Sequence, residues 1–203
     1  AAWSVDAFTR SYTDPETYRA LRNSVLLSAV VTVCATAIGV YLAFLVSRTT
    51  TPLRRLVTPA MVLVVALPAL FYAIGWGMLG NPRIGPLNTI WQDLTGSAGP
   101  LLDINSWPGL ALVGILKSSA FAYILLLGPF LAMDRSLEEA ARMAGASRLR
   151  TYWSVNLPLL APAVSGVLIL SFVIGLEYFE VPLLLGTPAD LTVFSTQIYG
   201  LIN

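Results

Sequence analysis

Four long apolar runs, separated by polar segments, constrain the fold of this chain more than any other feature. The runs cover residues 23–47, 56–79, 108–133 and 157–185. At about 1.5 Å per residue, the first of them reaches roughly 36 Å as a helix, which is enough to cross a hydrocarbon core about 30 Å thick. Only 11% of the 203 residues are charged and 56% are hydrophobic, whereas about a quarter of the residues in soluble domains are charged. The sequence therefore predicts an all-α integral membrane protein, a polytopic bundle of transmembrane helices.

Arginine residues indicate the direction in which the predicted spans run. They gather in the connection between the first and second spans and in the connection between the third and fourth. They are Arg48, Arg54 and Arg55 in the first connection and Arg135, Arg142, Arg148 and Arg150 in the second. Because basic residues are retained on the cytoplasmic side, both connections are predicted to be cytoplasmic. Residues 1–22 are then an external polar segment, residues 80–107 an external connection, and residues 186–203 an external tail.

Several residue types and motifs that carry chemistry are missing from the sequence. It has no histidine, a single cysteine, and no glycine-rich phosphate loop that ends in Gly-Lys-Ser or Gly-Lys-Thr. The sequence therefore predicts no catalytic residue, no metal site and no bound cofactor, and any energy from ATP has to enter through a partner. The formal net charge of +1 gives no sign of a nucleic-acid partner.

The polar loop at residues 134–156 combines helix signals with small residues. Ser136 and Glu139 have the spacing of a capping box, which predicts the start of a short helix, and Gly145 predicts its end. A second short helix capped by Ser147 is expected to follow. Small side chains on one face of the first helix would allow a partner to approach the backbone closely. That face carries Leu137, Ala140, Ala141 and Ala144.

The order of residues in this loop resembles the EAA motif of the type I permeases of bacterial ABC importers. That motif is Glu-Ala-Ala, three residues, Gly, nine residues, Ile, one residue and then Leu-Pro. The matching positions here are Glu139, Ala140, Ala141, Gly145, Val155, Leu157 and Pro158. Only Val155 departs from the motif, and it keeps the branched apolar character of isoleucine. The alternative explanation of the same loop is an amphipathic hairpin that lies on the membrane surface.

The resemblance implies a bundle of the MetI-like kind, whose loop forms cytoplasmic coupling helices. In that family the coupling helices dock on a cytoplasmic ABC ATPase dimer, which uses the ATP, and a periplasmic solute-binding protein delivers solute for alternating access. Carried onto this sequence, the contact and turn positions are Glu139, Ala140, Ala141 and Gly145. Leu157 and Pro158 would relay the motion into the fourth span. The implied partners also include a second permease half, in the same or a fused chain, and the lipid of the bacterial inner membrane.

Comparison with this family also predicts that the chain is incomplete. Family members have one further span before the first span of this sequence and another after the fourth. Residues 23–185 would therefore form most of a permease domain, and the chain would be a fragment of a longer protein.

Four further stretches resemble the ferric-iron branch of these permeases, and in particular the first half of its fused chains. They are residues 67–70, 74–76, 82–88 and 175–182. The same broad branch includes importers of polyamine, thiamine and phosphonate, so these solutes remain alternatives to ferric iron. The alternatives from other classes are an ATP-independent channel or secondary carrier, which would need no EAA loop, and a membrane scaffold without transport.

Three ionisable residues lie within the predicted spans, Lys117 in the third and Glu177 and Glu180 in the fourth. An unpaired charge at the bilayer centre costs at least about 2.5–3.5 kcal/mol, so each side chain needs a partner, a water-filled cavity or a route to the interface. Lys117 and Glu177 have similar predicted depths of about 12–13 Å, which favours an ion pair between the two helices. Our functional hypothesis is that the three residues line the translocation path of a cation. The alternative is a structural ion pair, or side chains that extend toward the headgroups.

Overall fold

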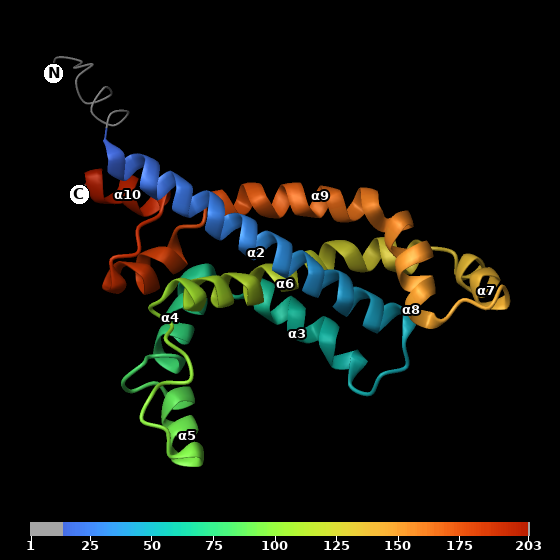
Figure 1. Cartoon of the computed structure of the whole chain (residues 1–203), viewed down its shortest axis with the longest axis horizontal. Coiled ribbons are helices and arrows are strands. Elements are labelled where there is room, and N and C mark those ends of the chain that lie inside the picture. The colour runs from blue at the N-terminus through green and yellow to red at the C-terminus, as the bar shows by residue number, and fades with distance from the viewer. Residues whose placement is uncertain (1–13, 203) are drawn as a thin grey trace. The chain divides into compact units, whose positions relative to one another are not determined.

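The computed structural model describes residues 14–202, and every regular element in that range is helical (Figure 1). The longer helices are α2 (Pro15–Arg48), α3 (Arg54–Ala66), α4 (Ala69–Leu79), α6 (Trp107–Ala132) and α9 (Leu157–Leu176). The shorter helices are α5 (Pro86–Thr95), α7 (Arg135–Met143), α8 (Arg148–Thr151) and α10 (Phe194–Ile202). Three turns are also helical, namely the π-helical η1 (Tyr152–Asn156) and η2 (Pro182–Gly186) and the 3₁₀-helical η3 (Thr187–Ala189).

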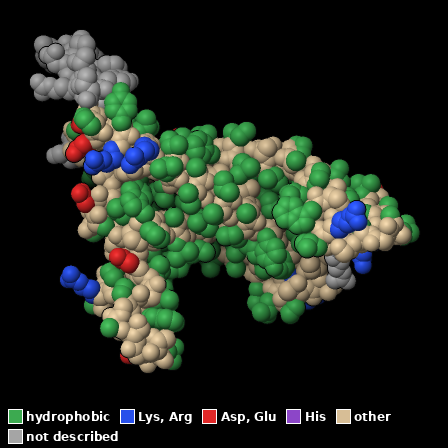
Figure 2. All heavy atoms as spheres, in the orientation of Figure 1, with side chains coloured by type: hydrophobic (Ala, Val, Ile, Leu, Met, Phe, Trp, Pro, Cys, Tyr) green, Lys and Arg blue, Asp and Glu red, His purple; other side chains and the backbone are tan. Residues whose placement is uncertain are grey.

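Three segments of the described chain are long and apolar enough to cross a membrane as single helices. They are Pro15–Arg48, Trp107–Ala132 and Leu149–Leu176, and the pair α3 and α4 would add a fourth if it counts as one span. Hydrophobic side chains cover much of the surface of the long helices (Figure 2). Examples are Val33 on α2 and Ile169 on α9, which are 61% and 68% exposed. A helix satisfies its own backbone polar groups, as a lipid environment requires, and the predicted all-α membrane class is confirmed.

Helix α2 begins earlier than the predicted first span. Asp14 accepts a hydrogen bond from the Glu16 backbone N–H at 2.9 Å, and Pro15 occupies the first helical position, so both residues favour a helix start. The helix then continues without a break to Arg48. Residues 15–22 of the predicted external polar segment 1–22 are therefore part of the first long helix. Residues 1–13 lie outside the described part of the chain.

The predicted second span, residues 56–79, is divided into two helices. Helix α3 ends at Ala66 and α4 starts at Ala69. Pro68 causes the interruption, because its ring disfavours a helical conformation of Leu67 and it has no N–H to continue the hydrogen-bond ladder. From the sequence, Pro68 is one of several prolines that interrupt the predicted spans, and nothing singles it out as the end of a helix.

The predicted fourth span, residues 157–185, ends earlier and starts earlier than expected. Helix α9 ends at Leu176, and the chain then forms the separate turn η2. At its other end α9 is continuous with α8 through η1, so the second short helix of the polar loop is the start of this long segment. The tail beyond residue 186 contains η3 and α10, which the sequence analysis did not predict.

The described chain divides into two compact units. Unit 1 contains residues 14–31, 67–115 and 172–202, and unit 2 contains residues 32–66 and 116–171. Each unit has its own buried residues and is described separately.

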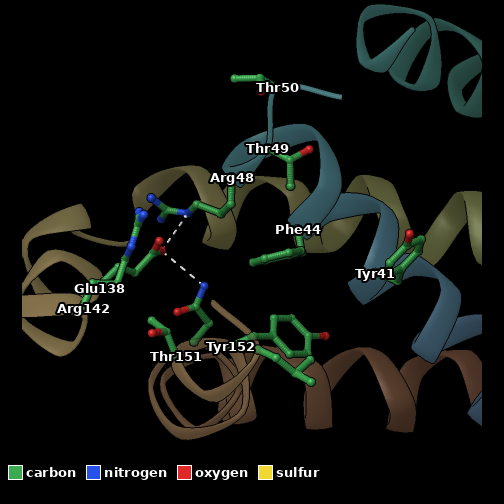
Figure 3. Close-up of a pocket in the computed structure, with 11 residues that line it drawn as sticks. Tyr41, Phe44, Arg48, Thr49, Thr50, Glu138, Arg142, Thr151 and Tyr152 are labelled. Atoms are coloured by element: carbon green, nitrogen blue, oxygen red, sulfur yellow. Dashed lines mark hydrogen bonds and ion pairs between the residues drawn. The ribbon is translucent and has the colours of Figure 1, made fainter. Parts of the chain in front are cut away.

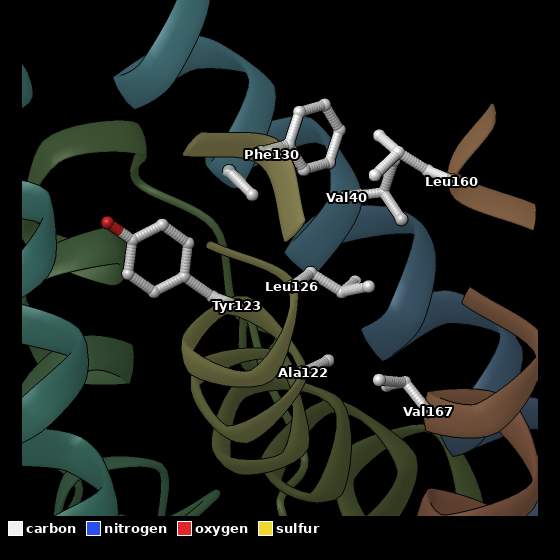
Figure 4. Close-up of a cluster of buried hydrophobic side chains, with 8 residues drawn as sticks. Val40, Ala122, Tyr123, Leu126, Phe130, Leu160 and Val167 are labelled. Carbon is white, nitrogen blue, oxygen red and sulfur yellow. The ribbon is translucent and has the colours of Figure 1, made fainter. Parts of the chain in front are cut away.

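The core of unit 2 is formed by α2, α6 and α9 (Figure 4). Its buried side chains are Val40, Ala43, Ala122, Tyr123, Leu126, Phe130, Leu160 and Val167. Helices α2 and α6 approach closely at Gly39, where an added Cβ would lie 2.8 Å from the Ala122 Cβ. The Tyr123 hydroxyl lies 2.6 Å from the Thr58 hydroxyl, and this hydrogen bond ties α3 to the same core. Unit 2 is thus a packed four-helix arrangement that can support the polar loop.

Residues 80–107, predicted as an external connection, are a folded segment of unit 1 that contains helix α5. Asn88 on α5 is 1% exposed. Its side-chain amide donates to the carbonyls of Asn81 at 2.9 Å and Leu102 at 2.8 Å, and its oxygen accepts from the Leu102 N–H at 2.9 Å. One buried side chain therefore satisfies backbone groups on both sides of α5 and holds residues 80–107 in a defined conformation.

Candidate functional site

The polar loop at residues 134–156 lies entirely in unit 2 and starts with helix α7. The predicted capping box of Ser136 and Glu139 is wrong. Asp134 is the N-cap, and its carboxylate accepts a hydrogen bond from the Ser136 backbone N–H at 2.9 Å. This hydrogen bond holds the pKa of Asp134 below its ordinary value. A carboxylate is a stronger acceptor than a hydroxyl and is favoured by the helix dipole, which explains why the helix starts at this earlier residue.

Gly145 ends α7, as predicted. It has a φ of +85°, in the left-handed region where glycine carries no steric penalty. Its N–H donates to the Arg142 carbonyl and the Ala146 N–H donates to the Ala141 carbonyl, both at 3.0 Å. This pair of hydrogen bonds is the Schellman motif. The first helix of the loop therefore has a defined length and a defined turn after it.

The positions that match the EAA motif differ in exposure. The exposed ones are Glu139, Ala140, Gly145 and Pro158, and the half-buried ones are Ala141, Val155 and Leu157. Because Glu139 and Ala140 are exposed on a capped helix, they are free to meet another protein. Their contact with an ATPase stays a prediction.

The second half of the loop leads directly into α9. Ser147 caps α8 as predicted, since its hydroxyl accepts from the Arg150 N–H at 3.3 Å. The chain then widens into η1, in which the Leu157 N–H bonds to the Tyr152 carbonyl five residues earlier. Pro158 follows immediately, and its ring would clash with the carbonyl four residues before it in a regular α-helix. The π-helical turn accommodates this proline within a continuous helical segment.

One side chain of α7 points inward and was missed by the sequence analysis. Oε1 of Glu138 forms an ion pair with Nε of Arg48 at 3.1 Å and accepts a hydrogen bond from the Asn156 amide at 3.2 Å (Figure 3). The Arg48 side chain is 4% exposed and the Glu138 side chain 19%, and Asn156 is 1% exposed. These three groups come from the end of α2, from α7 and from the end of η1.

Arg48 also binds the end of α6. Its terminal nitrogen donates to the backbone carbonyls of Phe130 at 2.8 Å and Met133 at 2.7 Å. The last four carbonyls of a helix have no partner within the helix, so a guanidinium placed there satisfies groups that would otherwise need water. From the sequence alone, Arg48 indicates only the orientation of the spans.

A cavity of about 450 Å³ adjoins this ion pair (Figure 3). Most of its lining is aromatic or polar and comes from α2, from the two residues that follow α2, and from α7, α8 and η1. The lining residues are Tyr41, Phe44, Arg48, Thr49, Thr50, Glu138, Arg142, Leu149, Thr151, Tyr152 and Asn156. Phe44 and Tyr152 form one wall, with ring centroids 4.7 Å apart in an edge-to-face arrangement.

The three ionisable residues predicted for the spans lie in different units. Lys117 is half-buried on α6 in unit 2, and its ammonium donates to the Val64 carbonyl at 3.1 Å. In a continuous helix that carbonyl would bond to the N–H of residue 68, which proline lacks. Glu177 is exposed and Glu180 half-buried, and both follow the end of α9 in unit 1. Their pairing with Lys117 stays a prediction.

Metal ligation was not predicted for this chain. Within residues 14–202 no group of three or more cysteine, aspartate or glutamate side chains is placed to hold a metal ion.

Several curated relatives match most of this chain, and two of them are transport permeases named for different solutes. It is 26% identical to the putative ferric transport system permease protein FbpB 1 of Haemophilus influenzae, over 89% of this chain and 28% of that protein. It is also 26% identical to the sulfoquinovosyl glycerol transport system permease protein SmoG of Agrobacterium fabrum, over 86% of this chain and 57% of that protein. The chain thus spans 28% and 57% of the lengths of these two relatives.

The fold and the family are shown by two further matches. A crystal structure of a bacterial ABC transporter involved in the import of alginate superposes with a TM-score of 0.83, at 22% identity, over 98% of this chain and 72% of that one. Residues 35–203 match the family described as binding-protein-dependent transport system inner membrane component. Because this match covers most of the sequence, the chain belongs to that family, the inner-membrane permeases of ABC importers, which are not enzymes.

Proposed function

We propose that this chain forms part of the translocation pathway of an ABC importer and that α7 docks on a cytoplasmic ATPase subunit. The observation that carries the proposal is the form of α7. It is a short exposed helix with a carboxylate cap at its start and a Schellman glycine at its end, and it carries the EAA residues. We call α7 the coupling helix from here on.

The chemistry of the coupling helix fits docking rather than catalysis. Exposed Ala140 offers no bulk, so the backbone of the helix can approach a groove on the partner, and exposed Glu139 offers a charge to a basic residue there. The chain carries no phosphate-binding loop, so ATP would be bound and hydrolysed by the partner. Closure of an ATPase dimer would then move the coupling helix and switch the spans between outward-facing and inward-facing states. A periplasmic binding protein and a second permease half would complete the transporter.

For the solute we propose ferric iron, which would be cargo rather than a resident metal. The support is the resemblance of residues 67–70, 74–76, 82–88 and 175–182 to ferric-type permeases, together with the ferric transport name of the Haemophilus influenzae relative. The name of the Agrobacterium fabrum relative favours a glycoside as the second candidate. Lys117, Glu177 and Glu180 remain our candidates for residues along the path of a cation.

Co-purification with the cognate ATPase subunit tests the docking proposal. Glu139→Arg reverses the exposed charge, and Gly145→Pro imposes a negative φ where the helix stop needs +85°. We expect both variants of the full-length permease to lose most of the bound ATPase. The matched control is Asp93→Arg, a charge reversal at an exposed position of α5. If both loop variants retain the ATPase subunit and transport solute like the control, the proposal fails.

Stimulation of ATP hydrolysis tests the solute. The complete transporter is reconstituted in proteoliposomes and supplied with a binding protein loaded with ferric iron or with one loaded with a glycoside. We expect ATP hydrolysis and uptake to rise only with the iron-loaded protein. A rise only with the glycoside-loaded protein would replace iron by the second candidate.

A further inference from the structure

We infer that Glu138, the residue immediately before the EAA sequence, is the positioning residue that joins the coupling helix to α2, α6 and α9 so that they move together. The inference rests on the proposed function of the coupling helix and adds to it the means by which its motion reaches the spans. We call the side chains of Glu138, Arg48 and Asn156, with the Phe130 and Met133 carbonyls, the Glu138 junction.

One carboxylate oxygen of Glu138 contacts side chains from two separate elements. Oε1 of Glu138 is 3.1 Å from Nε of Arg48 and 3.2 Å from Nδ2 of Asn156. Arg48 is the last residue of α2, and Asn156 is the last residue before α9. If the coupling helix moved without these elements, both interactions would lengthen together.

Arg48 extends the junction to α6. The same guanidinium that pairs with Glu138 donates to the Phe130 and Met133 carbonyls at 2.8 and 2.7 Å. A planar guanidinium with several fixed donors transmits orientation better than a flexible ammonium does. The coupling helix is thus connected through one arginine to two long helices, and through one asparagine to a third.

The side chains of the junction are largely buried. The side chains of Arg48 and Glu138 are 4% and 19% exposed, and Asn156 is 1% exposed. Hydrogen bonds and ion pairs are stronger where water is excluded, and a partner left alone there is destabilised. A surface ion pair would break readily under force, whereas this buried junction should remain intact when the coupling helix is pushed.

Neighbouring glutamates on the coupling helix therefore have different roles. Successive residues of an α-helix point about 100° apart, so Glu138 and Glu139 cannot face the same surface. Glu139 is exposed and available to the ATPase, whereas Glu138 faces the bundle. We assign docking to Glu139 and transmission to Glu138.

The test uses the complete transporter, with its ATPase subunits and binding protein, in proteoliposomes. ATPase retention, ATP hydrolysis and solute uptake are measured for the wild type, Glu138→Gln and Glu139→Arg. Glutamine keeps an oxygen acceptor for Asn156 but removes the charge that pairs with Arg48. We expect Glu138→Gln to retain the ATPase subunit and hydrolyse ATP, while uptake per ATP falls about tenfold. Glu139→Arg should instead lose the ATPase subunit.

A second variant separates transmission from simple loss of folding. Asn156→Asp places a second carboxylate beside Glu138, and the two share one arginine while Arg142 lines the adjoining cavity. Two close carboxylates favour taking up one shared proton. Uptake per ATP by Asn156→Asp should therefore be low at about pH 8 and recover toward wild type at about pH 6, where the shared proton restores a hydrogen bond. A misfolded protein would not recover on acidification.

The outcomes distinguish the inference from the proposed function. If the wild type itself retains no ATPase subunit, the proposed function fails and the inference fails with it. If the wild type is coupled and Glu138→Gln keeps normal uptake per ATP, only the inference fails. If Glu138→Gln loses the ATPase subunit as Glu139→Arg does, Glu138 belongs to the docking surface and the inference is again overturned. Recovery of Asn156→Asp at low pH supports it.

Discussion

Replacing Arg48 by methionine should destabilise the protein by an amount that the structure allows us to work out. Methionine keeps much of the apolar stem but leaves the Glu138 carboxylate without its cation. Removing one partner of a buried ion pair costs about 3–5 kcal/mol, and we take the lower end because the Glu138 side chain is 19% exposed. For a domain of about 150–250 residues, about 1 kcal/mol corresponds to a shift of about 2–4 °C in Tm, so we expect the Tm of the domain that contains Arg48 to fall by about 6–12 °C.

The double variant Arg48→Met with Glu138→Met provides the internal check. Replacing both members of a buried pair by apolar residues of similar volume is often close to neutral. We therefore expect the double variant to regain more than half of the Tm lost by Arg48→Met alone. Such a recovery of Tm would show an interaction energy between the two positions, because mutations at independent sites have additive effects.

The assay is thermal unfolding of the full-length permease in detergent, followed by tryptophan fluorescence. The control is Arg83→Met, which removes an exposed arginine and should change stability by no more than about 0.5 kcal/mol. A shift for Arg48→Met as small as that of the control would refute our reading of the ion pair. The ion pair would also be refuted if the double variant lost as much stability as Arg48→Met and Glu138→Met lose in sum.

Three further predictions follow from other sites. Asp134→Ala should weaken the protection of the α7 amides against hydrogen exchange at neutral pH. Because the pKa of Asp134 is lower in the folded state, the stabilisation from this carboxylate is full above its ordinary pKa of 3.8 and disappears as the pH falls through the folded pKa. The exchange rates of the wild type and the variant should therefore converge in acid. Gly39→Val should lower Tm strongly, because its Cβ would lie 2.8 Å from that of Ala122, whereas Gly128→Val on α6, where a Cβ meets nothing within 4 Å, is the control. Glu180→Gln should assemble normally but lose solute uptake if this side chain lines the path, and loss of assembly instead would indicate a structural role.

Two of the helix ends in the polar loop could be predicted from the local sequence. Gly145 and Ser147 were predicted as the stop of one helix and the cap of the next, and both are confirmed by their backbone hydrogen bonds. These features depend on residues within one turn, so the sequence contains the information. The start of the first helix was predicted wrongly as a capping box of Ser136 and Glu139. Two local patterns compete at this position, and the Asp134 carboxylate forms the observed cap.

Breaks within the long apolar runs were harder to predict. Within the runs at 56–79 and 157–185 a helix ends internally, at Ala66 and at Leu176, although the hydropathy of each run is continuous. Hydropathy predicts whether a segment can enter lipid, but it does not predict where the helix within that segment ends. A proline alone does not locate such a break, because Pro59, Pro129 and Pro162 lie inside helices.

The sequence by itself determined the membrane class, the helical loop with its EAA residues and the family resemblance, because composition and short-range spacing carry these properties. The tertiary structure alone decided that Glu138 meets Arg48 and Asn156, which are 90 and 18 residues away along the chain. No local pattern encodes such a pairing, because it forms only when the packing of α2, α6 and α9 brings the end of one helix beside the loop that follows another. The sequence thus predicts the helical loop that carries the EAA residues, whereas the Glu138 junction forms only in the folded protein.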